Sequence, residues 1–179
     1  MALSTIGTNS IADDAVTSAK TSGVGITMAE QWRLTGGYDV PSATTDITAW
    51  SIASGRGFGK LGSSMTLDTG VFTFPSTGIY YIIAHAYIFR NSNASEFAGI
   101  LIRTTTDNSS YNTAAESYGN VENTTNEHSE ATISFQFDVS NTSTHKVKFS
   151  SSASDNNTCR FGGGNSNQTH VTFIRLGDT

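Results

Sequence analysis

The histidines carry the most versatile chemistry in this sequence, since an imidazole can bind a metal ion or exchange a proton near neutral pH. There are four, His85, His128, His145 and His170. Each falls on a different expected element, and no pair has the close spacing of a zinc site. We interpret His85, which lies within an apolar run, as a hydrogen-bonded histidine of the core or of a subunit interface. We therefore expect no metal site.

The sequence contains no recognisable catalytic motif. Ser, His and Asp are common, but no Gly-x-Ser-x-Gly sequence is present to expose a nucleophile. The stretch Gly55-Arg-Gly-Phe-Gly-Lys60 is rich in glycine, yet it lacks the Gly-Lys-Ser/Thr ending of a phosphate-binding loop, and we interpret it as a hairpin or bulge. We expect the protein not to be an enzyme and to need no cofactor.

Two loop segments offer oxygen atoms that could bind a hard cation such as calcium. They are Asp107 with Asn108, and Asp155 with Asn156 and Asn157. Calcium takes about six to eight oxygen ligands, and neither segment supplies several carboxylates. Asp and Asn also form turns by accepting hydrogen bonds from their own backbone, so we favour turns over a calcium site.

Cys159 is the only cysteine, which excludes an intrachain disulfide and a zinc site built from cysteines. It lies in the polar, glycine-rich residues 150–168, which are expected to form a long loop. We expect no role for its thiol.

The composition limits the partners. Charged residues make up 14% of the chain, against about 25% in an average soluble protein, and the net charge is -5. Nucleic-acid binding requires clustered Lys and Arg, and the sequence contains no such cluster. It also contains neither a secretory signal nor a long apolar span, so we expect a soluble protein made in a cytosol, without membrane insertion.

Residues 70–90 hold the clearest strand pattern. Phe72 and Phe74 alternate with smaller residues, as in a strand with one buried face, and Pro75-Ser-Thr-Gly78 predicts a turn. Residues 79–89 are apolar almost without a break, which predicts a central strand covered on both faces.

Shorter strands are expected on both sides of this stretch. In residues 132–139 the apolar positions alternate strictly with polar ones. Residues 111–129 predict a peripheral strand followed by a loop. The other expected strands are residues 31–34, 50–52, 97–103, 146–149 and 170–176. This number of short strands favours an all-β, antiparallel two-sheet sandwich; a jelly roll is our prediction, and an immunoglobulin-like sandwich is the alternative.

The sequence Gly70-x-Phe72-x-Phe74-Pro75-x-x-Gly78-x-Tyr80 resembles the corner of C1q/TNF-like jelly-roll domains. The resemblance extends less specifically from about Gln31 to Leu176. It implies that these corner residues shape the core and that the domain is a compact homotrimer. The aromatic surplus on the strands points the same way, with the alternative that it only fills the monomer core. The candidates for the trimer interface or the core are Tyr81, Tyr87, Phe135, Phe137 and Phe173.

The beginning of the chain has a different character. Its residues 6–20 resemble segments near the starts of tail-fibre and other structural proteins of marine bacteriophages, and residues 31–34 and 72–80 resemble C1q-like proteins of such phages. The resemblance implies a virion structural protein, in which an N-terminal arm, residues 1–28, anchors a jelly-roll head, residues 29–179. We expect a short helix ending near Lys20, and anchoring contacts through Ile6, Ile11 and Val16.

Two roles follow from this resemblance. In the first, the protein is the tip of a tail fibre or other appendage and binds a host surface, with carbohydrate as the candidate ligand. In the alternative, its trimers are capsid decoration proteins that stabilise the shell. In both, the expected partners are further copies of the chain and other virion proteins.

Overall fold

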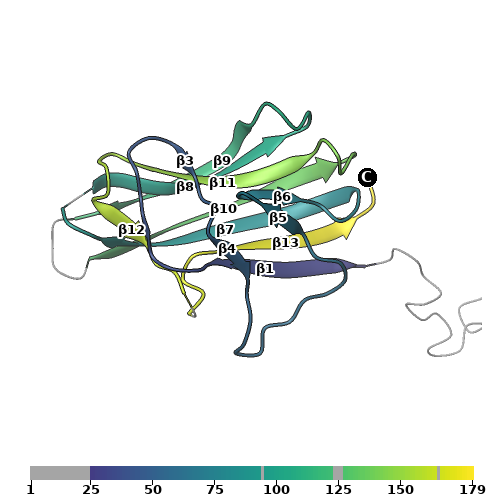
Figure 1. Cartoon of the computed structure of the whole chain (residues 1–179), viewed down its shortest axis with the longest axis horizontal. Helices are drawn as coiled ribbons and strands as arrows, with labels where there is room; N and C mark the ends of the chain where they lie inside the picture. The colour runs from purple at the N-terminus through teal and green to yellow at the C-terminus, as the bar shows by residue number, and fades with distance from the viewer. Residues whose placement is uncertain (1–24, 94, 123–126, 165) are drawn as a thin grey trace, which may run out of the picture.

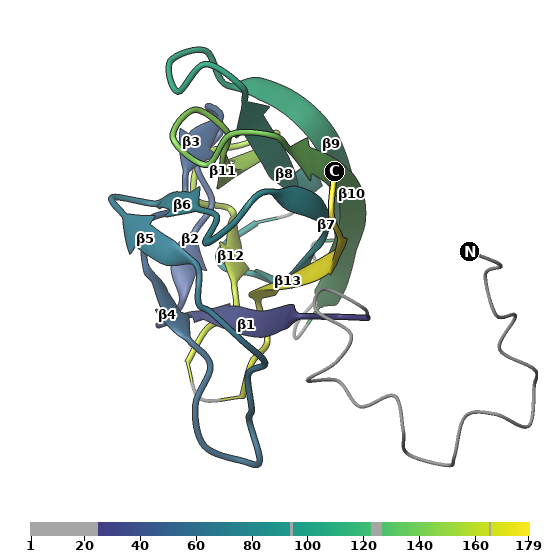
Figure 2. The ribbon, with the colours of Figure 1, turned by 90° about the vertical axis from the view of Figure 1, so that its right-hand side faces the viewer.

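The protein is described by a computed structural model that covers residues 25–93, 95–122, 127–164 and 166–179. The regular secondary structure in these ranges consists of β-strands alone, which form two antiparallel sheets packed face to face (Figures 1 and 2). The helix expected near Lys20 and the anchoring residues Ile6, Ile11 and Val16 lie outside the described residues. The described part of the chain contains no helix long and apolar enough to cross a lipid bilayer.

The first sheet, sheet A, is built around the longest strand, β7. On one side β7 pairs with β10 from Gly78 to Phe89; on the other it pairs with β13 and then with β12. β13 continues the sheet to β1 and β4, and β12 continues it to β2. The strands of sheet A are β1 (Met28–Leu34), β2 (Tyr38–Asp39), β4 (Trp50–Ile52), β7 (Gly78–Arg90), β10 (His128–Val139), β12 (Cys159–Phe161) and β13 (His170–Gly177).

The second sheet, sheet B, has the order β5-β6-β11-β8-β9, and β3 also pairs with β11. β11 and β8 form its centre, since they pair over their whole common length. The strands of sheet B are β3 (Thr45–Asp46), β5 (Thr66–Asp68), β6 (Val71–Thr73), β8 (Ser95–Thr105), β9 (Asn112–Val121) and β11 (Lys146–Ala153).

The core lies between the sheets and is rich in aromatic rings. Phe72 stands at its centre: its ring centroid lies 5.2 Å from that of Trp32, 5.6 Å from that of Phe149 and 5.1 Å from that of Phe173. All four side chains are buried. Phe72 and Phe149 come from sheet B and Trp32 and Phe173 from sheet A, so these contacts hold the two layers together.

The corner between β6 and β7 has the geometry that its sequence predicts. Phe74 is 2% exposed and packs against Tyr80 at 4.6 Å between ring centroids. The Tyr80 hydroxyl donates to the carbonyl oxygen of Ser76 at 3.0 Å, which ties the turn to the strand. A Cβ atom on Gly78 would lie 2.5 Å from the carbonyl oxygen of Gly177, so only glycine allows β7 to pass this close to β13.

A buried carboxylate supports the opposite side of the core. Glu30 points inward from β1 and is only 3% exposed. Its Oε1 accepts hydrogen bonds from the indole nitrogen of Trp32 at 2.8 Å and from the backbone nitrogen of Met65 at 2.6 Å. Glu30 therefore fixes the long connection between β4 and β5 onto β1, a role that its polarity did not suggest in the sequence.

The prediction of one long loop over residues 150–168 is wrong. β11 continues through Ser150, Ser151 and Ser152 to Ala153, because these residues pair with β8 and are buried, and the pairing overrides the low strand propensity of serine. A further strand, β12, lies within the expected loop. The placement of Cys159 in that loop is therefore also wrong, since the residue lies on β12 with its side chain fully buried.

We expect Phe74→Ala to lower the free energy of unfolding by about 3–5 kcal/mol, because it removes a buried ring between the two sheets. Asn156→Ala is the control, since Asn156 is exposed and its side-chain oxygen accepts only a long bond, 3.4 Å, from the nitrogen of Ser42. Chemical denaturation of both variants makes the comparison. Equal losses of stability would contradict this description of the core.

Candidate functional site

The outer face of β7 is apolar although it points away from the core. Alternate residues of this strand are half-buried, whereas those between them are fully buried against sheet B. The sequence-based expectation that β7 is covered on both faces is thus met within one copy of the chain on one face only. We call the outward row the β7 stripe; it consists of Ile79, Tyr81, Ile83, His85, Tyr87 and Phe89.

The neighbouring strands extend this face with uncharged side chains. Residues paired across an antiparallel sheet point to the same side. Ile83 therefore has Ser134 of β10 and Thr172 of β13 beside it, and Tyr81 has Gln136 and Ile174. The charged groups Glu130 and Asp138 lie on the outermost strand, β10. The centre of the outer face of sheet A is therefore neutral, with the apolar β7 stripe flanked by mostly polar, uncharged side chains.

Three of the four histidines gather on this face, although the sequence places them on three different strands. The rings of His85 and His170 lie 5.1 Å apart across the β7–β13 pair. The ring of His128 stacks on Tyr87 at 5.2 Å. His145 lies apart from them and stacks on Phe137. Only the register of the sheet could reveal this grouping, because nothing in the spacing along the chain indicates it.

Both paired histidines are held by hydrogen bonds. Nδ1 of His85 lies 2.8 Å from the Thr132 hydroxyl, and Nδ1 of His170 donates to the carbonyl oxygen of Asn167 at 3.0 Å. Burial lowers the pKa of His170 below its ordinary value of 6.5, and the nearby His85 lowers it further. Among the described residues no three His, Cys, Asp or Glu side chains are grouped to hold a metal ion.

The structure divides the residues predicted for the trimer interface or the core. Tyr81 and Tyr87 belong to the β7 stripe, so they are available to a partner. Phe135, Phe137 and Phe173 point inward, with Phe137 and Phe173 buried and Phe135 half-buried where β10 forms the edge of the sheet.

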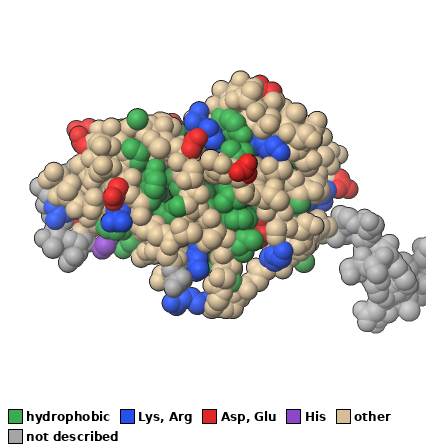
Figure 3. All heavy atoms as spheres, viewed as in Figure 1, with side chains coloured by type: hydrophobic (Ala, Val, Ile, Leu, Met, Phe, Trp, Pro, Cys, Tyr) green, Lys and Arg blue, Asp and Glu red, His purple; other side chains and the backbone are tan. Residues whose placement is uncertain are grey.

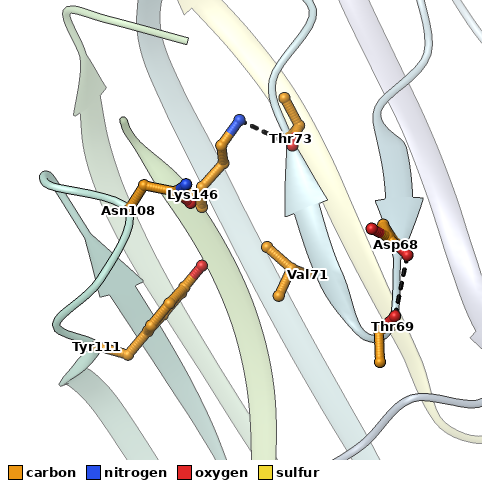
Figure 4. A pocket seen from close by; sticks show the side chains of 7 residues that line it. All are labelled: Asp68, Thr69, Val71, Thr73, Asn108, Tyr111 and Lys146. Atoms are coloured by element: carbon orange, nitrogen blue, oxygen red, sulfur yellow. Dashed lines mark hydrogen bonds between the residues drawn. The ribbon is translucent and has the colours of Figure 1, made fainter. Parts of the chain in front are cut away.

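A second candidate site is a cleft of about 440 Å³ on the outer face of sheet B (Figure 4). Its floor is formed by outward side chains of β6 and β11, and its two walls are the β5–β6 turn and the β8–β9 turn. The floor residues are Val71, Thr73 and Lys146, and the wall residues are Asp68, Thr69, Asn108 and Tyr111. Apart from the corner strand, the sequence analysis singled out only Asn108 among them.

The β8–β9 turn is fixed by Asp107. Its Oδ1 accepts hydrogen bonds from the Thr105 hydroxyl at 2.7 Å and from the backbone nitrogens of Ser109 and Ser110 at 2.8 Å each. The hydrogen bond from the Ser110 backbone, together with those from Thr105 and Ser109, holds the pKa of the carboxyl well below its usual range. The interpretation of Asp107 as a turn residue is confirmed, and Asn108 takes the left-handed conformation beside it with φ of 59°.

Two cations contact Tyr111, one at its ring and one at its backbone carbonyl. The Lys148 ammonium lies 4.3 Å from the centre of its ring, and Arg103 donates to its carbonyl oxygen at 2.9 Å. Both cations also pair with Asp46, at 2.6 Å from Lys148 and 3.6 Å from Arg103. Burial raises the pKa of Tyr111, as do the charges of Asp46 and Asp107, so its phenol stays neutral at physiological pH.

Elsewhere sheet B exposes an aromatic pair, Phe97 and Tyr118, near the start of β8 and therefore far along the sheet from the cleft. Each is 40% exposed, and their rings meet edge to face at 5.3 Å.

On the face in Figure 3 the exposed hydrophobic side chains form separate patches, and the charged groups are scattered without a patch of one sign. This face thus offers no basic surface to a nucleic acid.

No family model and no curated protein matches this sequence. Solved structures do match. Murine APRIL, in its crystal structure at pH 8.5, aligns with a TM-score of 0.59 and 11% identity over 83% of this chain and 98% of the other. Eiger TNF from S. frugiperda aligns with a TM-score of 0.63 and 12% identity over 87% of this chain and 95% of the other. The fold is a C1q/TNF-like jelly roll. At such low identity the similarity establishes the fold alone.

The jelly-roll prediction is therefore confirmed, and the immunoglobulin-like alternative is wrong. The corner from Gly70 to Tyr80, which carried the sequence resemblance, forms the turn between the two sheets of this jelly roll. The β7 stripe lies on the outer face of sheet A, and the cleft, whose lining residues Figure 4 shows, lies on the outer face of sheet B.

We expect the pH dependence of unfolding to report on His170. Because its pKa in the folded state is lowered, the unfolded chain takes up the proton first, so stability is complete above pH 6.5 and is lost as the pH falls from 6.5 through the folded-state pKa. His85 of β7 and Arg33 of β1 are the titratable groups paired beside it; on β10 the facing residue is Thr132.

The free energy of unfolding, measured with denaturant at a series of pH values, should therefore decrease less steeply with falling pH for His170→Gln than for the natural chain. The same substitution at His145, on the β10–β11 turn, serves as the control. If the free energy of unfolding of His170→Gln depends on pH as steeply as that of the natural chain, His170 is not the group responsible.

Proposed function

We propose that this chain is a non-enzymatic structural protein whose jelly-roll heads assemble into a homotrimer through the outer face of sheet A. The observation that carries the proposal is the β7 stripe. A half-buried apolar row with aromatic residues at the centre of a neutral face has the composition of the core of a protein interface. Contact of such a row with water is unfavourable, and burial against a partner removes that contact.

The margins of the face suit a ring of identical copies. Glu130 and Asp138 project from β10 on one side, and Arg33 projects from β1 on the other. When copies are related by rotation, the β10 side of one copy meets the β1 side of the next, which brings acidic groups near basic ones. Interfaces of this type close into rings, and the C1q/TNF resemblance supports a ring of three.

The place of this trimer is proposed from the arm. Because residues 6–20 resemble the starts of phage tail-fibre and other structural proteins, we assign the protein to a virion, after synthesis in the host cytoplasm. Residues 1–28 attach it to other virion proteins through Ile6, Ile11 and Val16, and the head faces outward. The favoured role is the tip of a tail fibre that binds host-surface carbohydrate; in a capsid decoration protein the same arms would bind the shell.

We expect the natural chain at micromolar concentration to sediment with near three times its mass of 19.0 kDa. Ile83→Glu should sediment as a monomer, because it places a charge at the centre of the apolar face. Thr113→Glu, on an exposed position of β9 in sheet B, is the matched control and should remain trimeric. Sedimentation equilibrium distinguishes these outcomes, and a monomeric natural chain would sink the assembly proposal.

Deletion of residues 2–22 tests the arm. We expect the shortened protein to remain trimeric but to be lost from particles, because the described strands all begin at or after Met28. Immunoblotting of purified particles measures incorporation, and thermal unfolding of the soluble protein measures the head. Normal incorporation would contradict anchoring by the arm; a lowered melting temperature of the head would show instead that the arms bind within their own trimer.

A further inference from the structure

We propose that the cleft between the β5–β6 and β8–β9 turns is a binding site for a neutral saccharide. The inference rests on the proposed function in one respect, since it names the ligand class and the site of a head that binds carbohydrate. Its evidence is separate from the evidence for assembly, because the cleft lies on sheet B and the β7 stripe on sheet A.

The cleft has the size and accessibility of a ligand site. Its volume of about 440 Å³ falls within the range of small-molecule pockets, about 300–1,000 Å³. It lies between two turns that are far apart in the sequence (Figure 4), and its floor is formed by β6 and β11 of sheet B. Assembly through the outer face of sheet A therefore leaves it open.

The groups that line the cleft match the hydroxyls of a sugar. Asp68 offers a carboxylate that accepts hydrogen bonds, and the Asn108 amide both donates and accepts. The Lys146 ammonium donates to the Thr73 hydroxyl at 3.0 Å and to the Thr142 carbonyl at 2.7 Å, which leaves one of its three N–H groups for a ligand. Adjacent hydroxyls of a pyranose both donate and accept, so they can use this mixed set.

Two apolar surfaces complement these polar groups. The Val71 side chain lies in the floor, and the Tyr111 ring forms part of one wall. The C–H groups on one face of a pyranose pack against such surfaces and withdraw from water. The combination of apolar floor, aromatic wall and mixed donors and acceptors distinguishes this cleft from a purely polar surface groove.

The charge balance favours a neutral ligand over an anionic one. The cleft itself contains one carboxylate, Asp68, and one ammonium, Lys146. The nearby cations Lys148 and Arg103 pair with Asp46. The hydrogen-bond partners of Lys146 are the neutral Thr73 hydroxyl and Thr142 carbonyl, so the two charges of the cleft cancel. An anionic sugar would be attracted by Lys146 but repelled by Asp68, whereas a neutral sugar can use both groups.

The wall formed by the β8–β9 turn is preformed, which reduces the entropy lost on binding. The three hydrogen bonds to Asp107 fix the turn that carries Asn108, and Lys148 and Arg103 hold Tyr111.

The other wall contains a strained residue. Thr69 has φ of 49° and Gly70 has φ of 84°, a pair of positive values that hairpins normally meet with Asn or Gly at the first position. A β-branched residue is rarely found in this conformation. The hydroxyl of Thr69 donates to Asp68 Oδ1 at 2.9 Å and orients the carboxylate at the rim. Strain of this kind concentrates at functional sites, where the side chain is needed despite its cost.

The test uses the full-length trimer and a panel of immobilised oligosaccharides. One half of the panel contains neutral di- and trisaccharides of hexoses and N-acetylhexosamines, and the other contains the same sugars bearing sialic acid or sulfate. We expect binding to members of the neutral half, and we expect Asp68→Asn and Asn108→Gly to weaken it by about tenfold or more. Glycine is chosen at position 108 because it keeps the left-handed backbone.

Two further variants make the result specific to the cleft. Tyr118→Ala alters the exposed aromatic pair of the same sheet and should leave saccharide binding unchanged. Thr69→Asn should raise the melting temperature, because it relieves the strained turn, and should weaken binding. Sedimentation and thermal unfolding of every variant show that the trimer is intact, so a failure of this proposal is distinguishable from a failure of assembly.

Three outcomes would overturn the proposal. They are the absence of binding to the neutral half of the panel by an intact trimer, binding confined to the sialylated or sulfated half, and binding that is lost in Tyr118→Ala but retained in Asp68→Asn and Asn108→Gly.

Discussion

The pairing of β7 along both of its edges is the constraint on which the rest of the molecule depends. Twelve consecutive residues of β10 pair with β7 on one side, and β13 and β12 share the other side. Because side chains alternate along a strand, this pairing commits one row of β7 to the core and the other to the outside. A shift by one residue would exchange the two rows, and the contacts of Tyr80 and Ile82 with the core would be lost.

The same pairing places the β7 stripe on the outer face of sheet A, where its apolar side chains are unusual. In most antiparallel sheets that face water, the outer row is polar. Here the inner row is fully buried and the outer row is still apolar, so the strand is built to be covered on both faces. Sheet B covers one face. Nothing within the described chain covers the other, which is why assembly through sheet A is central to the proposed function.

The sequence predicted those parts of the fold that depend on local pattern. Phe72 and Phe74 alternate within a short window, and the turn after them contains proline and glycine, so both the strand and the corner were visible. The buried serines of β11 were not, because their strand conformation comes from pairing with β8, about fifty residues away in the chain. The inward carboxylate of Glu30 was missed for a similar reason, since its partners include Met65 from a distant loop.

The candidate sites were predictable only in part. Tyr81 and Tyr87 could be proposed as interface residues because the run containing them is too apolar for one thin sandwich. The grouping of His85 with His170 depends on the register between β7 and β13, and the cleft depends on two turns brought together by β6, β11 and β8. Neither leaves a signal in residue spacing. Thr69 is the exception that could have been noticed, as a β-branched residue before glycine in a tight turn.

The two proposed functions, assembly and ligand binding, lie on opposite faces of the head. Sheet A carries the apolar β7 stripe at the centre of a neutral face with opposite charges at its margins, which suits contact between copies of the chain. Sheet B carries a cleft with both polar and apolar lining groups, one wall of which is held by the hydrogen bonds to Asp107, and this suits a small ligand. The layers are joined through the aromatic contacts around Phe72, so a trimer assembled on one face presents the other in a fixed orientation.

Hydroxyl-radical footprinting of the natural full-length chain tests the central claim most directly, because it reports the exposure of each aromatic side chain in the assembled protein. Tyr118 and Phe97, exposed on sheet B, serve as internal references. We expect Tyr81, Tyr87 and Phe89 to be protected at micromolar concentration and to become reactive as dilution dissociates the trimer, while the labelling of the references does not change. Labelling of Tyr81 and Tyr87 that is independent of protein concentration and as rapid as that of Tyr118 would contradict assembly through this face.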